Sequence, residues 1–104
     1  LEGVWINLLI NAVDAIDHDH GEILLSSRLI DSAIQVNVED NGKGISEEDL
    51  SHIFEPFYTT KDQGHGTGLG LSICHRVVEQ LGGKITVQSM PKSGTRFIVV
   101  LPVE

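Results

Sequence analysis

The sequence predicts an α+β domain in which helices cover one face of a β-sheet. Residues 1–16 and 69–81 place apolar side chains three and four positions apart, which is typical of helices with one buried face. Residues 22–30, 33–40, 84–89 and 95–103 instead have the composition of strands, and Ile34, Val36 and Val38 alternate with polar residues. With a short helix after residue 46, these segments give two layers.

The ends of these elements have local signals. Gly21 closes the first helical region, and Asp31 and Ser32 separate the first two strands. Ser46 precedes three acidic residues and is therefore expected to cap a short helix. Gly82 and Gly83 end the helix over 69–81, and residues 90–94 form the turn of a terminal hairpin. The first helix has no N-cap residue, so we expect the chain to be a piece of a longer one.

Composition narrows the possible partners. The 104 residues correspond to one domain, and 7 basic residues against 15 acidic ones give a net charge of −8. This charge argues against a nucleic-acid or anionic-membrane surface. The single cysteine, Cys74, excludes an internal disulfide and favours a reducing compartment. Without a membrane-spanning stretch or a signal pattern, the expectation is a cytoplasmic domain with no direct membrane contact.

A glycine cluster precedes the helix over 69–81. "GHGTGLGLSI", residues 64–73, has four glycines in its first seven positions. Glycines let main-chain N–H groups approach a ligand closely, and a helix N-terminus attracts phosphate. A plain flexible loop is the alternative. The cluster is neither a P-loop nor a Rossmann fingerprint, because no Lys-Ser/Thr pair follows it and its glycine spacing differs.

Polar residues form a stripe on the first helix. Asn7, Asn11 and Asp14 lie four and three positions apart and so share one helix face. The stripe is either a solvated edge beside the apolar face or part of a metal site. A carboxamide oxygen suits Mg²⁺, which substrate phosphates often help to ligate.

A second candidate motif is "DNGKG", residues 40–44, directly after a strand. Asn-Gly favours a simple turn. Alternatively, Asp40 at the strand end accepts a hydrogen bond from an exocyclic amine such as that of adenine, and the glycines admit the flat base. Calcium binding of the EF-hand type is excluded, because the alternating oxygen ligands and the closing glutamate are absent.

Five segments occur in an order that resembles a known family. They are "NLLINAVDAI", "DNGKGI", "FEPFYTTK", "GHGTGLGLSI" and "GTRFIVVLP", spanning Asn7 to about Pro102. The chain resembles the catalytic ATP-binding domain of sensor histidine kinases, which is of the Bergerat type also found in DNA gyrase, mismatch-repair and chaperone ATPases. The resemblance implies a two-layer sandwich with a mixed β-sheet and three helices on one face. It also implies that residues 1–104 are a single domain truncated at the N-terminus, whose missing first strand leaves a sheet edge unpaired.

The resemblance assigns the base and metal sites. Asn11 is similar to the asparagine that ligates Mg²⁺, and Asn7 and Asp14 lie on the same face beside the nucleotide. Many relatives have a basic residue in place of Asp14, so this chain departs from the family's pattern at that phosphate contact. The base pocket is formed by Asp40, which binds the adenine amine, and by Gly42, Gly44, Ile45 and Thr95.

The resemblance also assigns a nucleotide lid. Phe54 and Phe57 are similar to the aromatic pair at its start. Lys61 is the substitute candidate for the missing basic residue, and the alternative is a solvated loop lysine. The residues expected to lie against the phosphates are Gly64, His65, Gly66, Thr67, Gly68, Leu69 and Gly70.

The implied chemistry is phosphoryl transfer. ATP-hydrolysing relatives have a glutamate base one helical turn before the magnesium asparagine, where this chain has Asn7. The resemblance therefore implies a protein histidine kinase that transfers the γ-phosphoryl of Mg-ATP to a histidine on a separate dimerisation domain, for relay to a response regulator. No histidine of this chain lies in the context of such an acceptor, so we assign no catalytic residue here and do not expect activity from the chain alone.

Two alternatives remain open at this point. An anti-sigma-type protein serine kinase shares the fold, and a regulatory module would bind nucleotide without transferring a phosphoryl group. The sequence leaves open whether the parent kinase is anchored in a membrane.

Overall fold

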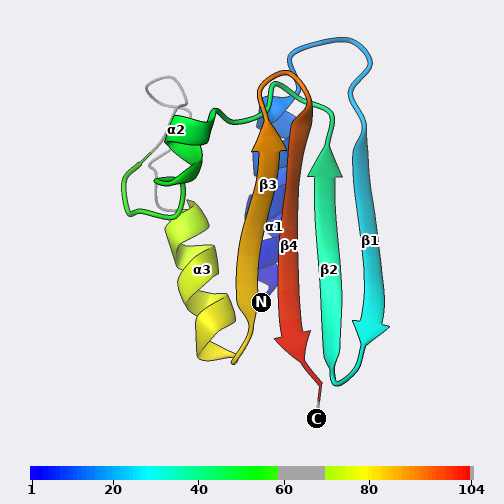
Figure 1. Cartoon of the computed structure of the whole chain (residues 1–104), viewed down its shortest axis with the longest axis vertical. Coiled ribbons are helices and arrows are strands. Elements are labelled where there is room, and N and C mark those ends of the chain that lie inside the picture. The colour runs from blue at the N-terminus through cyan, green and yellow to red at the C-terminus, as the bar shows by residue number, and fades with distance from the viewer. Residues whose placement is uncertain (59–69, 104) are drawn as a thin grey trace.

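The computed structural model describes residues 1–58 and 70–103. Its helices are α1 (Glu2–Ala15), α2 (Glu47–Leu50) and α3 (Gly70–Gln80). Its strands are β1 (Ile23–Ile30), β2 (Ala33–Asp40), β3 (Lys84–Met90) and β4 (Gly94–Pro102). Figure 1 shows α1 behind the sheet and α3 beside it. The predicted two-layer α+β class is confirmed, and α1, α3 and the four strands lie within one residue of their expected bounds, whereas the short helix, expected within residues 46–54, ends at Leu50.

The described strands form one sheet in the order β1-β2-β4-β3, and every neighbouring pair is antiparallel. The mixed pairing expected for the sheet is therefore not seen among these four strands. The physical reason is the position of β4. The connection through α2 and α3 brings β3 back in the same direction as β2, but β4 lies between the two and pairs antiparallel with both (Figure 1).

The core lies between the helices and one sheet face. Val38 pairs with Phe97, and Val99 pairs with Ile85, so these side chains share a face. Against this face pack the buried side chains of α1 and α3, namely Val4, Leu8, Cys74 and Val78. Burying one of the valine or leucine side chains in this set stabilises the fold by about 1.5–3 kcal/mol. The helical spacing of apolar residues in the sequence therefore supplies the helix side of this core, and the alternating spacing supplies the sheet side.

Strand β1 is the least covered element. All eight of its residues are exposed, including Leu25 at 56% and Leu29 at 68%. Among the described strands β1 has a neighbour on one side only. The outward face of α1 carries further exposed apolar side chains at Ile6, Ile10 and Val13. No helix within residues 1–58 and 70–103 combines the length and the apolar character needed to span a bilayer.

Candidate functional site

The end of the sheet where β2 finishes and β4 begins brings together two predicted site residues. Asp40 and Thr95 are register partners, and both lie on the face that the helices cover, because they are two residues from Val38 and Phe97. Thr95 is only 6% exposed. The main-chain N–H of Gly42 donates to Asp40 Oδ1 at 2.8 Å, and the main-chain N–H of Thr95 also hydrogen-bonds to this carboxyl group. The aspartate side chain is therefore held in one orientation.

Burial raises the pKa of Asp40 above its ordinary value. The hydrogen bonds from the N–H groups of Gly42 and Thr95 lower this pKa but do not offset the desolvation. A ligand that donates a hydrogen bond to such a poorly solvated carboxylate gains more than it would at the open surface. The position is suited to recognising an N–H donor.

The turn after Asp40 is pressed against the end of α1. Lys43 donates its main-chain N–H to the carbonyl of Ala15 at 2.8 Å. A Cβ on Gly42 would lie 2.3 Å from that same carbonyl oxygen, so a larger residue would separate the turn from the helix. The turn is thereby fixed relative to the last turn of α1, which carries Asp14.

The turn between β3 and β4 packs against the other side of the turn that follows Asp40. Gly44 has φ +75, and a Cβ on it would lie 2.0 Å from the carbonyl oxygen of Met90. Gly94 has φ +96, and its Cβ would lie 2.1 Å from the carbonyl oxygen of Asp40. These contacts explain why both positions are glycine, since each needs a left-handed conformation and no side chain.

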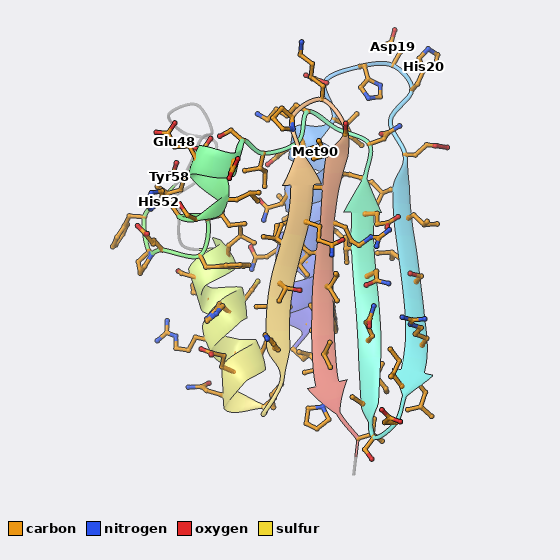
Figure 2. All side chains as sticks on the ribbon, in the orientation of Figure 1. Asp19, His20, Glu48, His52, Tyr58 and Met90 are labelled. Atoms are coloured by element: carbon orange, nitrogen blue, oxygen red, sulfur yellow. The ribbon has the colours of Figure 1, made fainter. Side chains whose placement is uncertain are left out.

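Asn41 fastens the loop between α1 and β1 to the same turn, a role that sequence reasoning missed. Its side chain accepts from Glu22 N at 2.8 Å and donates to His20 O at 2.8 Å. Its main-chain carbonyl contacts His18 Nε2 at 2.8 Å, and its N–H donates to Glu22 O at 3.3 Å. Figure 2 shows His20 at the same end of the molecule as Met90. The Asn-Gly pair indicated a turn but gave no sign of these long-range partners.

Ser89 is a second residue that sequence reasoning missed. Its hydroxyl accepts from Ile45 N at 2.8 Å, donates to Gly94 O at 2.8 Å and lies 2.9 Å from Thr95 Oγ1. The predicted pocket residues Ile45 and Thr95 are thus joined through β3.

The polar stripe of α1 lies between α3 and the turn. Asn7 donates from Nδ2 to Gly3 O at 2.9 Å, and a Cβ on Gly70 would lie 2.9 Å from Asn7 Oδ1. Asn7 therefore lies against the start of α3. Asn11 is half-buried and Asp14 exposed, one and two turns further along the helix toward the turn at Gly42.

The two phenylalanines predicted for the lid differ in burial. Phe54 packs on the core, with its ring centroid 6.4 Å from that of Phe97 and 5.2 Å from that of His75. Phe57 has φ +68 and is 73% exposed. The remaining lid predictions, Lys61 and residues 64–69, lie outside the described residues.

Tyr58 ends the described part of this segment. Its hydroxyl donates to Asp49 Oδ1, and its ring centroid lies 5.2 Å from that of His52. Figure 2 shows both His52 and Tyr58 beside α2. The bond to Asp49 raises the pKa of Tyr58 to about 12 and lowers the pKa of Asp49. Tyr58 thus joins the start of the predicted lid to α2.

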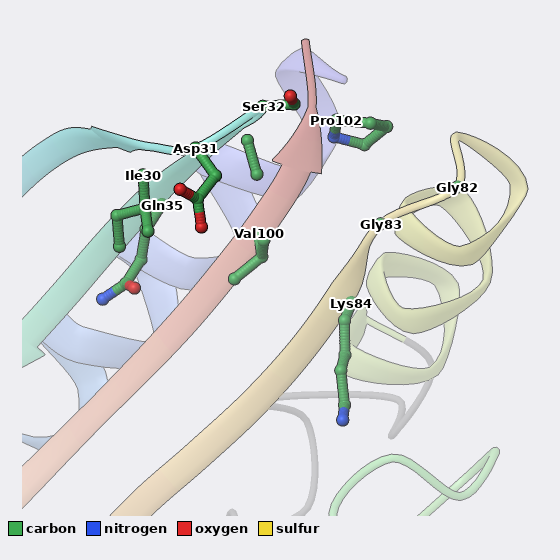
Figure 3. A pocket seen from close by; sticks show the side chains of 10 residues that line it. Ile30, Asp31, Ser32, Gln35, Gly82, Gly83, Lys84, Val100 and Pro102 are labelled. Carbon is green, nitrogen blue, oxygen red and sulfur yellow. The ribbon is translucent and has the colours of Figure 1, made fainter.

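A cavity of about 490 Å³ lies at the opposite end of the sheet (Figure 3). Its lining includes Asp31, Gly82, Lys84 and Pro102. None of the predicted site residues borders it, so it is separate from the arrangement around Asp40.

Known proteins resemble the chain along its whole length. It is 44% identical over 103 residues to the sensor histidine kinase ZraS of Escherichia coli O157:H7, covering 99% of this chain and 22% of that protein. The catalytic domain of the histidine kinase ThkA superposes with a TM-score of 0.81 at 42% identity, over 95% of this chain and 63% of that one. ShkA, solved at full length in complex with AMPPNP, superposes with a TM-score of 0.84 at 31% identity, over 96% of this chain and 20% of that one.

Residues 1–104 also match the family described as histidine kinase-, DNA gyrase B-, and HSP90-like ATPases. The matched span contains both the Asp40 turn and the buried Thr95, and the relatives named above are histidine kinases. The chain therefore belongs to this ATPase family, and within it the chain is homologous to the catalytic domains of sensor histidine kinases.

Proposed function

We propose that this chain binds Mg-ATP and presents the γ-phosphoryl group to a histidine on a separate dimerisation domain of its parent kinase. Membership of the family implies ATP binding. The chain spans only 22% of ZraS, so the activity of the whole protein goes beyond the match itself. The observation that carries the proposal is the Asp40 carboxyl group, held by the N–H groups of Gly42 and Thr95 at a desolvated strand end.

The base site is the better defined half of the proposal. Asp40 accepts a hydrogen bond from the exocyclic amine of adenine, and Thr95 forms the wall beside it. Gly42 and Gly44 keep the turn free of side chains, and Ile45 covers the base. This assignment is supported by the register pairing of Asp40 with Thr95 and by the close approaches of Gly42 and Gly44 to Ala15 and Met90.

The phosphate half is built on α1. Asn11 supplies an amide oxygen to Mg²⁺, and Asn7 and Asp14 flank it on the same helix face. The bound metal neutralises charge on the phosphates. Gly70 begins α3 beside Asn7, so the N–H groups of that helix end point toward the phosphates. Lys61 and residues 64–69 complete this half in the proposal.

Transfer to a protein side chain fits the polar groups better than hydrolysis does. Asn7 Nδ2 is committed to Gly3 O, and an amide cannot take a proton from water. In the transfer, the bond between the γ-phosphorus and its bridging oxygen breaks, a phosphorus–nitrogen bond to histidine forms, and ADP leaves. This chemistry depends mainly on positioning and charge stabilisation. We place the domain in the cytoplasm, where ATP and a response regulator are available.

The test uses the full-length kinase with γ-labelled ATP and Mg²⁺. We expect label on a histidine outside this chain, which is labile in acid and stable in alkali. Asp40→Ala should abolish labelling, whereas Asp31→Asn, at the opposite end of β2, should leave it unchanged, because asparagine tolerates the φ of 54 at this position. Acid-stable label would indicate a serine or threonine kinase, and rapid phosphate release by residues 1–104 alone would show that these residues hydrolyse ATP. Either result contradicts the proposal.

A further inference from the structure

Three short contacts converge on the hydroxyl oxygen of Ser89. They are to Ile45 N at 2.8 Å, Gly94 O at 2.8 Å and Thr95 Oγ1 at 2.9 Å. Ser89 and Thr95 are register partners on β3 and β4, so their side chains project from the same sheet face. The direction of each hydrogen bond can be assigned from the donors and acceptors available.

A serine hydroxyl has one proton and two lone pairs. The carbonyl of Gly94 has no proton, so its contact with Ser89 is favourable only when Ser89 donates. Ile45 N–H uses one lone pair of Ser89, which leaves the other lone pair for Thr95. All three contacts are hydrogen bonds only if Thr95 donates its single hydroxyl proton to Ser89.

This arrangement makes Thr95 an acceptor toward any ligand. Its proton is directed to Ser89, so only lone pairs of Oγ1 face the site. Asp40, its register partner on β2, is also an acceptor when ionised. At position 6, a 6-amino purine brings two N–H donors to this pair of acceptors, directly or through a water, whereas a 6-oxo purine brings a third acceptor there and carries its N–H at position 1. The second combination is repulsive.

We propose that Ser89 is a specificity-determining residue, which fixes the Thr95 hydroxyl as an acceptor and thereby favours 6-amino over 6-oxo purine nucleotides. This inference rests on the proposed nucleotide site. Ser89 does not touch the base: it acts on purine selectivity through Thr95, and its bond with Ile45 N separately holds the residue that covers the base. Removing its hydroxyl frees the Thr95 proton to turn toward a 6-oxo group.

The experiment measures calorimetric affinities of the chain for ATP and for inosine triphosphate, which has oxygen at position 6. Ser89→Ala should lower the ratio of ATP to inosine triphosphate affinity about three- to tenfold, the scale of one neutral hydrogen bond. Ser89→Thr keeps a hydroxyl and should have the same ratio as the unmutated chain. Ser93→Ala, in the neighbouring turn, is the matched control and should leave the ratio unchanged.

A double-mutant cycle distinguishes an effect of Ser89 on the orientation of the Thr95 hydroxyl from a general weakening of nucleotide binding. Thr95→Val should lower the ratio by itself, and adding Ser89→Ala to it should produce no further change. If Ser89→Ala does not fold, Ser89→Cys replaces it, because a thiol is only a weak acceptor for the Thr95 proton, and it should lower the ratio in the same direction. A ratio that is unchanged in Ser89→Ala, or in Thr95→Val, overturns the inference. Failure of the unmutated chain to bind ATP, or no effect of Asp40→Ala on ATP affinity, would instead overturn the nucleotide site itself.

Discussion

Tyr58 donates a hydrogen bond to Asp49 Oδ1 and so joins the start of the predicted lid to α2. Because the hydrogen bond is lost when the phenol ionises, it raises the pKa of Tyr58 to about 12. The same hydrogen bond is the main cause of a lowered pKa at Asp49, and a hydrogen bond with Ser46 is the next largest cause.

The titration of this phenol can be followed without labelling, since Tyr58 is the single tyrosine of the chain. In the folded protein we expect phenolate absorbance to appear only near pH 12, and in denaturant near the ordinary value of about 10. Asp49→Ala should move the folded midpoint toward that ordinary value, and Asp31→Asn should not move it. A folded midpoint already at about 10 in the unmutated chain would show that the bond is not formed.

The raised pKa of Asp40 predicts how stability changes with pH. Since burial lifts the folded pKa above the ordinary 3.8, the folded state holds this proton more tightly than the unfolded state. The contribution of Asp40 to stability is thus complete below pH 3.8 and is lost as the pH rises through the folded pKa. Asp40→Asn has no carboxyl to ionise. As the pH rises through the folded pKa of Asp40, this variant should therefore become more stable relative to the unmutated chain. Urea unfolding at successive pH values, followed by fluorescence of the single tryptophan Trp5, measures the difference. A difference that does not change with pH would contradict the burial effect.

The close contact of Gly94 with Asp40 predicts that alanine substitutions at Gly94 and at Gly3 have opposite effects on stability. Gly94→Ala places a Cβ 2.1 Å from Asp40 O at φ +96, so it should destabilise the fold by about 2 kcal/mol or more and weaken ATP binding. Gly3→Ala is the control, because Gly3 lies in α1 with no atom within 4 Å of a new Cβ. It should instead stabilise by about 0.5–1 kcal/mol. Urea unfolding checks both, and equal effects would mean that the β3–β4 turn does not press on Asp40.

The proposed role of Asn11 predicts how ATP affinity depends on Mg²⁺. If its amide oxygen ligates Mg²⁺, Asn11→Ala should remove most of the Mg²⁺-dependent part of ATP affinity and leave adenosine binding almost intact. Asn37→Ala, on the sheet face away from the helices, should change neither quantity. Calorimetric titrations with and without Mg²⁺ give the comparison. The stripe on α1 would have no metal role if Asn11→Ala bound Mg-ATP as the unmutated chain does.

The helices and strands could be predicted because their signals are local. The spacing of Val4, Leu8 and Ala12 predicted a buried helix face, and all three are buried. Ser46 caps α2 as expected, accepting from Asp49 N. The antiparallel pairing could not be predicted in this way, because the position of β4 depends on contacts between distant segments.

The same limit applies to the candidate site. Asp40 and the glycines around it were found from short motifs, since a strand end followed by Asn-Gly has a local pattern. The hydroxyl of Ser89 and the amide of Asn41 take their roles from partners elsewhere in the chain. A lone serine in a strand or an asparagine in a turn carries no local sign of such a role.

The central position of β4 also determines when the site can form during synthesis. β4 is made after β2 and β3, yet it lies between them and supplies the register partner of Asp40. A nascent chain emerging from the ribosome therefore holds α1, β2 and the Asp40 turn for some time with β4 absent and the apolar faces of β2 and β3 unjoined. If nucleotide binds at Asp40 and Thr95 as proposed, it can stabilise the domain only after β4 has been inserted, and ATP then cannot guide the early steps of folding.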